Sequence, residues 1–189
     1  MDVIEFNGKL YAIGGWNGSN VLEVLDPVTG TWTPLSPLPE GQSGLAAARV
    51  DDQIYTFGSY GVEDTTQIYD IGEDTWSSGP SLPSGMYWET AEAIGDKIYV
   101  IGGYAMGPPL NTVHILDTAT GTWSQGEPMP QSVQIPSSAV YNGEIYVFPV
   151  NYKYNPSTNS WTSFTAPPSG HGDAAEAVTV GDAIYLIGG

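Results

Sequence analysis

The chain has 189 residues, of which 41% are hydrophobic and 12% aromatic, and its formal net charge at pH 7 is −17. Only four residues are Lys or Arg, which excludes nucleic acid and anionic membrane surfaces as expected partners, because neutralising phosphates requires clustered basic side chains. The chain contains no cysteine, so disulfide frameworks, thiolate metal sites and cysteine nucleophiles are also excluded.

Short apolar runs, separated by turns rich in Gly, Pro, Asn and Asp, predict an all-β fold. The first predicted strand is residues 3–6, and the Asn7-Gly8 turn that follows is a strong hairpin signal. This turn leads into residues 9–15, the first of five copies of one segment. Each copy is apolar at consecutive positions, which predicts a strand buried on both faces.

The five copies are residues 9–15, 53–59, 97–103, 144–150 and 183–189. Their tyrosines lie 44, 44, 47 and 39 residues apart, a period typical of propellers and other stacked repeats. The fourth copy has Pro149-Val150 where the others place glycine, and its following loop is nearly deleted. We therefore expect the fourth repeat to form a shortened blade.

A third strand follows each of the first four copies and ends in a turn residue, namely Asp26, Asp70, Asp117 or Asn155. A tryptophan stands six residues further on and begins a fourth strand; these are Trp32, Trp76, Trp123 and Trp161. Pro-rich links then lead to the next repeat. Because they recur in register, we predict that the tryptophans and the repeat tyrosines form blade core, and that the Asp and Asn residues form turns.

The pattern resembles the kelch repeat over essentially the whole chain. The matching features are Ile98-Tyr99-Val100-Ile101-Gly102-Gly103, the Leu25-Asp26-Pro27 and Tyr69-Asp70 turns, and the Thr31-Trp32 and Ser160-Trp161 pairs that follow such turns. WD-type blades would show a Gly-His and Trp-Asp pair, which is missing. The resemblance implies a kelch-type β-propeller made of four-stranded antiparallel blades.

We expect a single kelch-repeat domain over residues 1–189, with four full repeats and half of a fifth. The predicted blades are residues 1–40, 41–84, 85–131 and 132–168, with a partial blade at residues 169–189. Kelch propellers commonly have six or seven blades, so the plain expectation is an incomplete or fragment propeller. The other expectation is a homo-oligomer assembled through unfinished blades.

Several aromatic residues fall outside the repeat register, and we predict that they bind a partner. In an up-and-down blade, the loop after the second strand and the link after the fourth emerge on the same rim. Exposed aromatics and Met on such loops are typical of binding surfaces. The predicted binding residues are Trp16, Tyr60, Glu63, Tyr87, Trp88, Tyr104, Met106 and His171.

Acidic residues also occur on these loops, at Glu40, Glu63, Asp64, Glu89 and Asp173. Together with the aromatics they would suit a cationic group. The predicted function is a non-enzymatic scaffold that binds a protein or peptide, with carbohydrate left open as a ligand.

An enzyme is the alternative function: a fragment of a carbohydrate-active or metal-dependent kelch enzyme, with self-assembly as a third class. His171, Asp173 and Glu176 are spaced so that they could contribute to a metal site, although Asp173 and Glu176 would point to opposite faces of a strand. Galactose-oxidase-like kelch enzymes need a Tyr–Cys cross-link, which this chain cannot form. We therefore predict no catalytic residues, no metal site and no cofactor.

Overall fold

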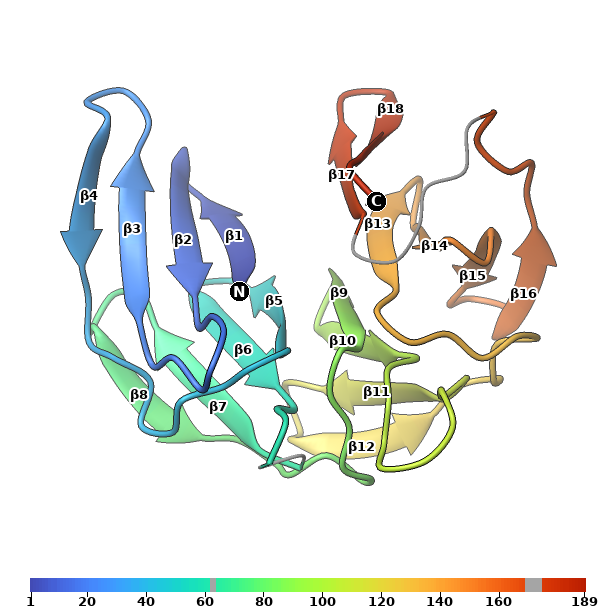
Figure 1. The fold of residues 1–189 in the computed structure, drawn as a ribbon, viewed down its shortest axis with the longest axis horizontal. Coiled ribbons are helices and arrows are strands. Elements are labelled where there is room, and N and C mark those ends of the chain that lie inside the picture. Colours follow the sequence, from blue (N-terminus) through green and yellow to red (C-terminus); the bar gives the residue numbers. More distant parts are fainter. Residues whose placement is uncertain (62–63, 169–174) are drawn as a thin grey trace. The chain divides into compact units, whose positions relative to one another are not determined.

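The computed structural model describes residues 1–61, 64–168 and 175–189, and these residues form an all-β structure. Four four-stranded antiparallel sheets are followed by a two-stranded sheet, and each larger sheet keeps its strands in chain order (Figure 1). The predicted fold class is thereby confirmed, since each larger sheet has the architecture of a propeller blade. The chain divides into two compact units, Met1–Tyr87 and Trp88–Gly189, here called unit 1 and unit 2.

Unit 1 contains two blades. Blade 1 consists of β1 (Asp2–Phe6), β2 (Lys9–Ile13), β3 (Leu22–Asp26) and β4 (Thr31–Pro34). Blade 2 consists of β5 (Ala46–Val50), β6 (Gln53–Phe57), β7 (Thr66–Asp70) and β8 (Thr75–Ser78).

Unit 2 contains two further blades and a hairpin. Blade 3 consists of β9 (Thr90–Ile94), β10 (Lys97–Ile101), β11 (Val113–Asp117) and β12 (Thr122–Gln125). Blade 4 consists of β13 (Ser137–Tyr141), β14 (Glu144–Phe148), β15 (Tyr152–Asn155) and β16 (Ser160–Ser163). The hairpin consists of β17 (Glu176–Val180) and β18 (Ala183–Ile187). Only residues 149–151 separate β14 from β15, so the loop of the fourth repeat is short, while blade 4 keeps all four strands.

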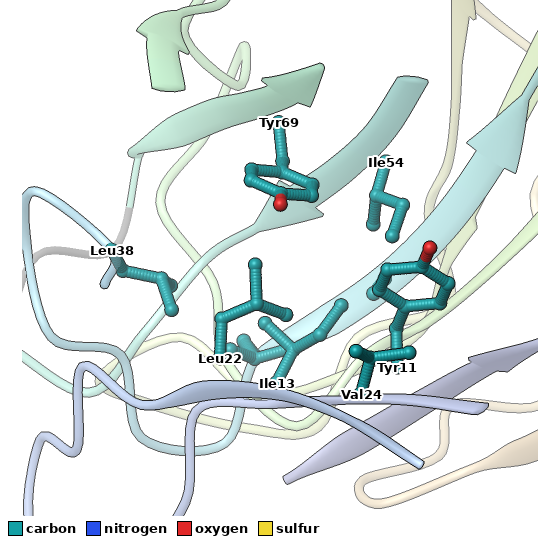
Figure 2. Packing of buried hydrophobic residues seen from close by; sticks show 9 residues of the cluster. Tyr11, Ile13, Leu22, Val24, Leu38, Ile54 and Tyr69 are labelled. Atoms are coloured by element: carbon teal, nitrogen blue, oxygen red, sulfur yellow. The ribbon is translucent and has the colours of Figure 1, made fainter. Parts of the chain in front are cut away.

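The core of unit 1 lies between its two blades. Tyr11, Ile13, Leu22 and Val24 of blade 1 point toward Ile54 and Tyr69 of blade 2 (Figure 2). Ile13 and Ile54 have no exposed surface, and Tyr69 is 1% exposed. Fully burying an aliphatic or aromatic side chain contributes about 1.5–3 kcal/mol, so this layer is a main source of the unit's stability.

The core of unit 2 is built from equivalent positions of blades 3 and 4. Its buried members are Tyr99, Ile101, Val113, Met129, Val133, Ile145, Val147 and Tyr154. As in unit 1, the repeat tyrosine of the first blade faces the third strand of the second, because the Tyr99 and Tyr154 ring centroids are 5.8 Å apart.

Side chains also join the innermost strands of neighbouring blades. The Asp2 carboxylate on β1 accepts a hydrogen bond from the Ala47 amide on β5 at 2.6 Å, and burial raises the pKa of Asp2. In unit 2, Thr179 on β17 donates to the Val140 carbonyl on β13 at 2.7 Å. Such bonds occupy backbone groups on a sheet edge, which would otherwise remain unpaired.

The predicted burial is confirmed for the repeat strands of blades 2 and 3, and it is wrong for β18 and for Trp32. The repeat strands β6 and β10 are buried on both faces apart from their first residues, as predicted. In contrast, β18 alternates, with Tyr185 53% and Ile187 63% exposed. Trp32 is likewise 50% exposed, although it was predicted to be core. Burial of these faces requires a further blade against them, and the described residues place none there.

The other repeat tryptophans, Trp76, Trp123 and Trp161, are more buried than Trp32. Trp76 and Trp161 pack beside buried tyrosines and donate indole hydrogen bonds to the Ser36 and Glu127 carbonyls at 2.8 and 2.7 Å. Among the residues that the structure describes, no helix is long and apolar enough to span a membrane.

Candidate functional site

The first candidate surface is the rim of unit 1, formed by the loops 14–21 and 58–65 and the links 35–45 and 79–87, apart from residues 62–63. Backbone hydrogen bonds connect these segments in series. The Gln42 amide donates to the Ser19 carbonyl at 3.1 Å, and the Tyr60 amide donates to the Ser43 carbonyl at 3.0 Å. The Leu82 amide donates to the Asp64 carbonyl at 3.0 Å. This rim is therefore a hydrogen-bonded framework rather than a set of independent loops.

Tyr60 is the best-supported aromatic side chain on this rim. Its side chain is 66% exposed, yet its amide is held by Ser43 and its ring packs edge-on against Tyr87 at 5.3 Å between centroids. Tyr87 is only 4% exposed, so it positions Tyr60 instead of offering its own surface. An exposed aromatic that is already immobilised loses little conformational freedom on binding.

Trp16 lies on the neighbouring loop and is 76% exposed. The backbone of its loop is closely fitted to the link, because a Cβ added at Gly41 would lie 2.0 Å from the Gly18 carbonyl oxygen. Only glycine allows this approach. The loop that carries Trp16 is thus anchored, although the indole itself projects into solvent.

Two exposed acidic residues, Glu40 and Asp64, lie on the rim of unit 1 together with Tyr60. Glu40 receives a hydrogen bond from Thr65 at 3.4 Å, and its backbone is bound at both N–H and C=O by the Gln67 side chain at 3.0 Å. Asp64 belongs to the same loop as Tyr60. The rim of unit 1 therefore combines two exposed aromatic rings with two described carboxylates.

The rim of unit 2 is formed by residues 88–89, the loop 102–112, the link 126–136 and the turn 149–151. The Gly103 amide donates to the Val133 carbonyl at 3.0 Å, and the Val133 amide donates to the Leu110 carbonyl at 2.9 Å. The Trp88 and Tyr104 rings lie 6.3 Å apart, and Met106 in the same loop is 82% exposed. The structure thus brings two of the predicted binding residues, Trp88 and Tyr104, together in unit 2, and Met106 lies in the same loop as Tyr104.

Trp88 has a left-handed backbone, which its side chain does not favour. Nine non-glycine residues of the described chain have a positive φ, and seven of them are Asn or Asp. The other two are Trp88, at 58°, and Ile135, at 52°. This conformation costs a residue with a Cβ about 1–2 kcal/mol, and short polar side chains tolerate it best.

Ile135 was not among the predicted site residues. The signal that identifies it is positional: Gly44, Trp88 and Ile135 each stand two residues before the first strand of a blade, and all three have a positive φ. The glycine at this position of the first link indicates that the backbone also has a positive φ at the equivalent positions of the other two links. The residues next to Ile135 in the sequence do not by themselves predict a positive φ at this position.

Other predicted residues are buried or lie outside the described part of the chain. Glu63, His171 and Asp173 fall in residues 62–63 and 169–174, which the structure does not describe. Glu89, expected among the rim acids, is only 6% exposed. The exposed acidic set on the described rims is therefore smaller than the sequence suggests.

The basic residues all lie on strands. Lys153 forms an ion pair with Glu144 at 2.6 Å, which raises its pKa, and the Arg49 guanidinium lies over the Phe6 ring at 4.7 Å. Lys9 and Lys97 are the first residues of β2 and β10. None of the rim loops and links of either unit contains Lys or Arg.

The described His, Asp and Glu side chains are the candidate ligands for a metal ion. The 1–61, 64–168 and 175–189 segments contain no group of three His, Asp or Glu residues placed to hold a metal ion. His114 is 2% exposed on β11, and burial lowers its pKa, which favours a neutral imidazole.

Comparison with protein-family models agrees with the blade architecture. Residues 2–189 match the model described as the KLHDC2/KLHL20/DRC7 Kelch-repeats domain. No curated protein matches the sequence significantly. The family match spans nearly the entire chain and confirms the resemblance seen in the repeat motifs. The chain therefore belongs to the KLHDC2/KLHL20/DRC7 Kelch-repeats domain family.

Proposed function

We propose that this kelch-repeat domain is a non-enzymatic scaffold that binds a protein or peptide through its aromatic rims. The kelch-repeat propeller fold is consistent with such a role. The observation that carries the proposal is Tyr60, which is 66% exposed although its backbone and ring are both held in place. Rigid exposed aromatics contribute much of the binding energy at protein interfaces.

The charge of the rims favours a partner with basic side chains. Glu40 accepts a hydrogen bond from Thr65 of the Tyr60 loop, Asp64 belongs to that loop, and no Lys or Arg occurs in any rim loop or link. An ammonium or guanidinium group can be attracted both by carboxylates and by the face of an aromatic ring. Acidic partner segments would be repelled by the net charge of −17.

A phage-displayed library of random peptides, panned on the whole chain, tests this proposal. We expect enriched peptides to contain Lys or Arg and to lack Asp and Glu. Their affinity should fall about tenfold or more for a Trp16→Ala, Tyr60→Ala double variant, as expected for loss of two interface anchors.

Trp32→Ala is the matched control, because Trp32 is 50% exposed in the same unit but lies on β4, outside the rim. It should leave peptide affinity unchanged. The proposal fails if no peptide sequence is enriched, or if the Trp16→Ala, Tyr60→Ala variant binds the enriched peptides normally.

Self-assembly is a second candidate, favoured by one face of the last hairpin. Val178, Val180, Tyr185 and Ile187 are 45–63% exposed on this face. Tyr185 occupies the repeat position of Tyr11, which packs against a following blade in unit 1. If a second copy covers this face, the solution mass will rise with concentration, and Tyr185→Lys will restore the monomer; a monomer at all concentrations contradicts this candidate.

A further inference from the structure

The positive φ at Trp88 and Ile135 places two large apolar side chains where the backbone favours glycine. The equivalent residue of the other described link is Gly44, with a φ of 70°. Elsewhere in the described chain the same conformation is taken by glycine, Asn or Asp. Unfavourable backbone conformations persist where the surrounding structure enforces them, and they concentrate at functional sites.

The two residues are also neighbours. The Ile135 amide donates a hydrogen bond to the Trp88 carbonyl at 3.1 Å, which joins the two links at these positions. Both side chains are half-buried. We call this pair the Trp88–Ile135 shelf.

Contacts within the protein cover only part of the apolar surface of Trp88 and Ile135. The Trp88 ring has the Tyr104 ring as a neighbour at 6.3 Å, and neither shelf residue is fully buried. A residue kept only for packing would be expected to bury its apolar surface more completely. Met106, on the same loop as Tyr104, adds further exposed apolar surface.

We propose that the Trp88–Ile135 shelf is an apolar subsite that takes one large aliphatic or aromatic side chain from a polypeptide bound at the rim of unit 2. This inference rests on the proposed peptide-binding function and adds a second requirement to it. The segment that carries the anchor is basic or neutral, because the rim of unit 2 carries the exposed Glu127 and its loops and links contain no Lys or Arg. The occupant is thus a polypeptide with an apolar anchor in a non-acidic context.

Trp88→Asn and Ile135→Asn are suitable test variants, because Asn adopts positive φ readily and so preserves the backbone while removing the apolar surface. The first probe is the most enriched phage peptide, synthesised and labelled with fluorescein. We expect each variant to weaken its binding about tenfold, with the melting temperature nearly unchanged. Replacing the apolar residue of the peptide by serine should weaken binding to the wild type equally, but should have no further effect on the variants.

A second measurement does not depend on the library. N-acetyl-leucinamide, titrated into the whole chain, should shift the Ile135 δ-methyl resonance in NMR spectra, and Trp88→Asn should abolish the shift. N-acetyl-glutamic acid amide should cause no shift there.

The outcomes separate the subsite from the function on which it rests. Loss of peptide binding in the Trp16→Ala, Tyr60→Ala variant, together with normal binding in both Asn variants, preserves the function and overturns the shelf. Absence of the leucinamide shift at Ile135 also overturns it. Peptide binding that depends on the shelf but not on Trp16 and Tyr60 overturns the unit 1 part of the proposed function instead.

Discussion

Unit 1 and unit 2 join their blades with the same set of hydrogen bonds, made by different residues. In unit 1, Asp74 of blade 2 accepts from the Ser36 amide at 2.9 Å and from the Tyr69 hydroxyl at 2.7 Å. The Trp76 indole then donates to the Ser36 carbonyl at 2.8 Å. We call this arrangement the blade latch, because it fixes the link that leaves one blade to the outer strands of the next.

The latch of unit 2 replaces the carboxylate by an amide. Asn159 accepts from the Glu127 amide at 2.6 Å and from the Tyr154 hydroxyl at 2.5 Å. Trp161 donates to the Glu127 carbonyl at 2.7 Å. The geometry is therefore retained while the charge of the central acceptor is not.

Blades 1 and 3 have different residues at the latch positions. Leu25 and Leu116 replace the tyrosine opposite the tryptophan, and Gly30 and Gly121 replace the acceptor two residues before the tryptophan. Neither leucine nor glycine has a side chain that can form these bonds. The sequence therefore alternates between two kinds of blade, and the repeating unit is a pair of blades rather than a single one.

The largest expected effect follows from removing the latch tryptophans. Trp76→Ala and Trp161→Ala should each destabilise their unit by about 2 kcal/mol, because each loses a packed ring and an indole hydrogen bond. Trp32→Ala should cost less than about 1 kcal/mol, because the Trp32 side chain is half exposed. Hydrogen exchange measured by mass spectrometry would assign each loss to its unit.

Equal effects of Trp32→Ala and Trp76→Ala would contradict this difference between blades. Trp76→Phe is a useful intermediate, since it keeps an aromatic ring but lacks the indole donor. It should recover part of the lost protection in unit 1 and leave unit 2 unaffected.

Removing the latch hydroxyls should have a smaller effect that differs between the units. Tyr69→Phe deletes a hydrogen bond to a carboxylate, which is typically worth about 1.5–3 kcal/mol, whereas Tyr154→Phe deletes a bond to a neutral amide, worth about 1 kcal/mol. Because Asp74 is near the surface, the unit 1 value should fall at the lower end. Urea denaturation of both variants would check the order, and a larger loss for Tyr154→Phe would refute the role assigned to charge.

Only the latch of unit 1 should weaken in acid. The hydrogen bond from Tyr69, and then that from the Ser36 amide, lower the pKa of Asp74 below its ordinary value of 3.8. A lowered folded-state pKa means that the stabilisation is complete above pH 3.8 and is lost as the pH falls through the lower, folded value. Acid titrations followed by hydrogen exchange should show this loss in unit 1.

Exchange of the two acceptors tests the same point directly. Asp74→Asn should remove the acid-dependent loss from unit 1, and Asn159→Asp should introduce it into unit 2. Acid sensitivity that does not follow the carboxylate would show that other groups control it.

Much of the fold could be predicted because each blade repeats the same local signals. The Asn7-Gly8 and Asn142-Gly143 turns, the apolar repeat strands and the Trp positions locate nearly all strands. Burial was predicted less well, since the exposure of Trp32 and Tyr185 depends on whether another blade covers them. A repeat pattern gives equivalent positions equivalent roles, and that assumption is wrong on faces without a described neighbour.

The candidate site was predicted only in part. The position of Tyr60 on a rim loop follows from blade topology, but the burial of Tyr87 beneath it depends on how the second link folds back. Ile135 was missed because positive φ is a backbone property that an isoleucine does not reveal. An alignment of the three links that places Gly44, Trp88 and Ile135 at equivalent positions would have identified Ile135.

The smallest expected difference between the latches appears in alkali. Burial raises the pKa of Tyr154 to about 12, whereas burial and the hydrogen bond to the Asp74 carboxylate raise the pKa of Tyr69 still further above the ordinary value of 10. For a group with a raised folded-state pKa, the stabilisation is complete below pH 10 and is lost as the pH rises through the folded value. Unit 2 should therefore lose its latch at a lower pH than unit 1.

Phenolate absorbance near 295 nm, compared between the wild type and the Tyr69→Phe and Tyr154→Phe variants, would isolate the two titrations. Asp74→Asn should bring the ionisation of Tyr69 closer to that of Tyr154, because the nearby negative charge is removed. If the pKa of Tyr69 is instead the same in Asp74→Asn as in the wild type, burial alone raises it. The two latches would then differ only in how their stability depends on acidic pH.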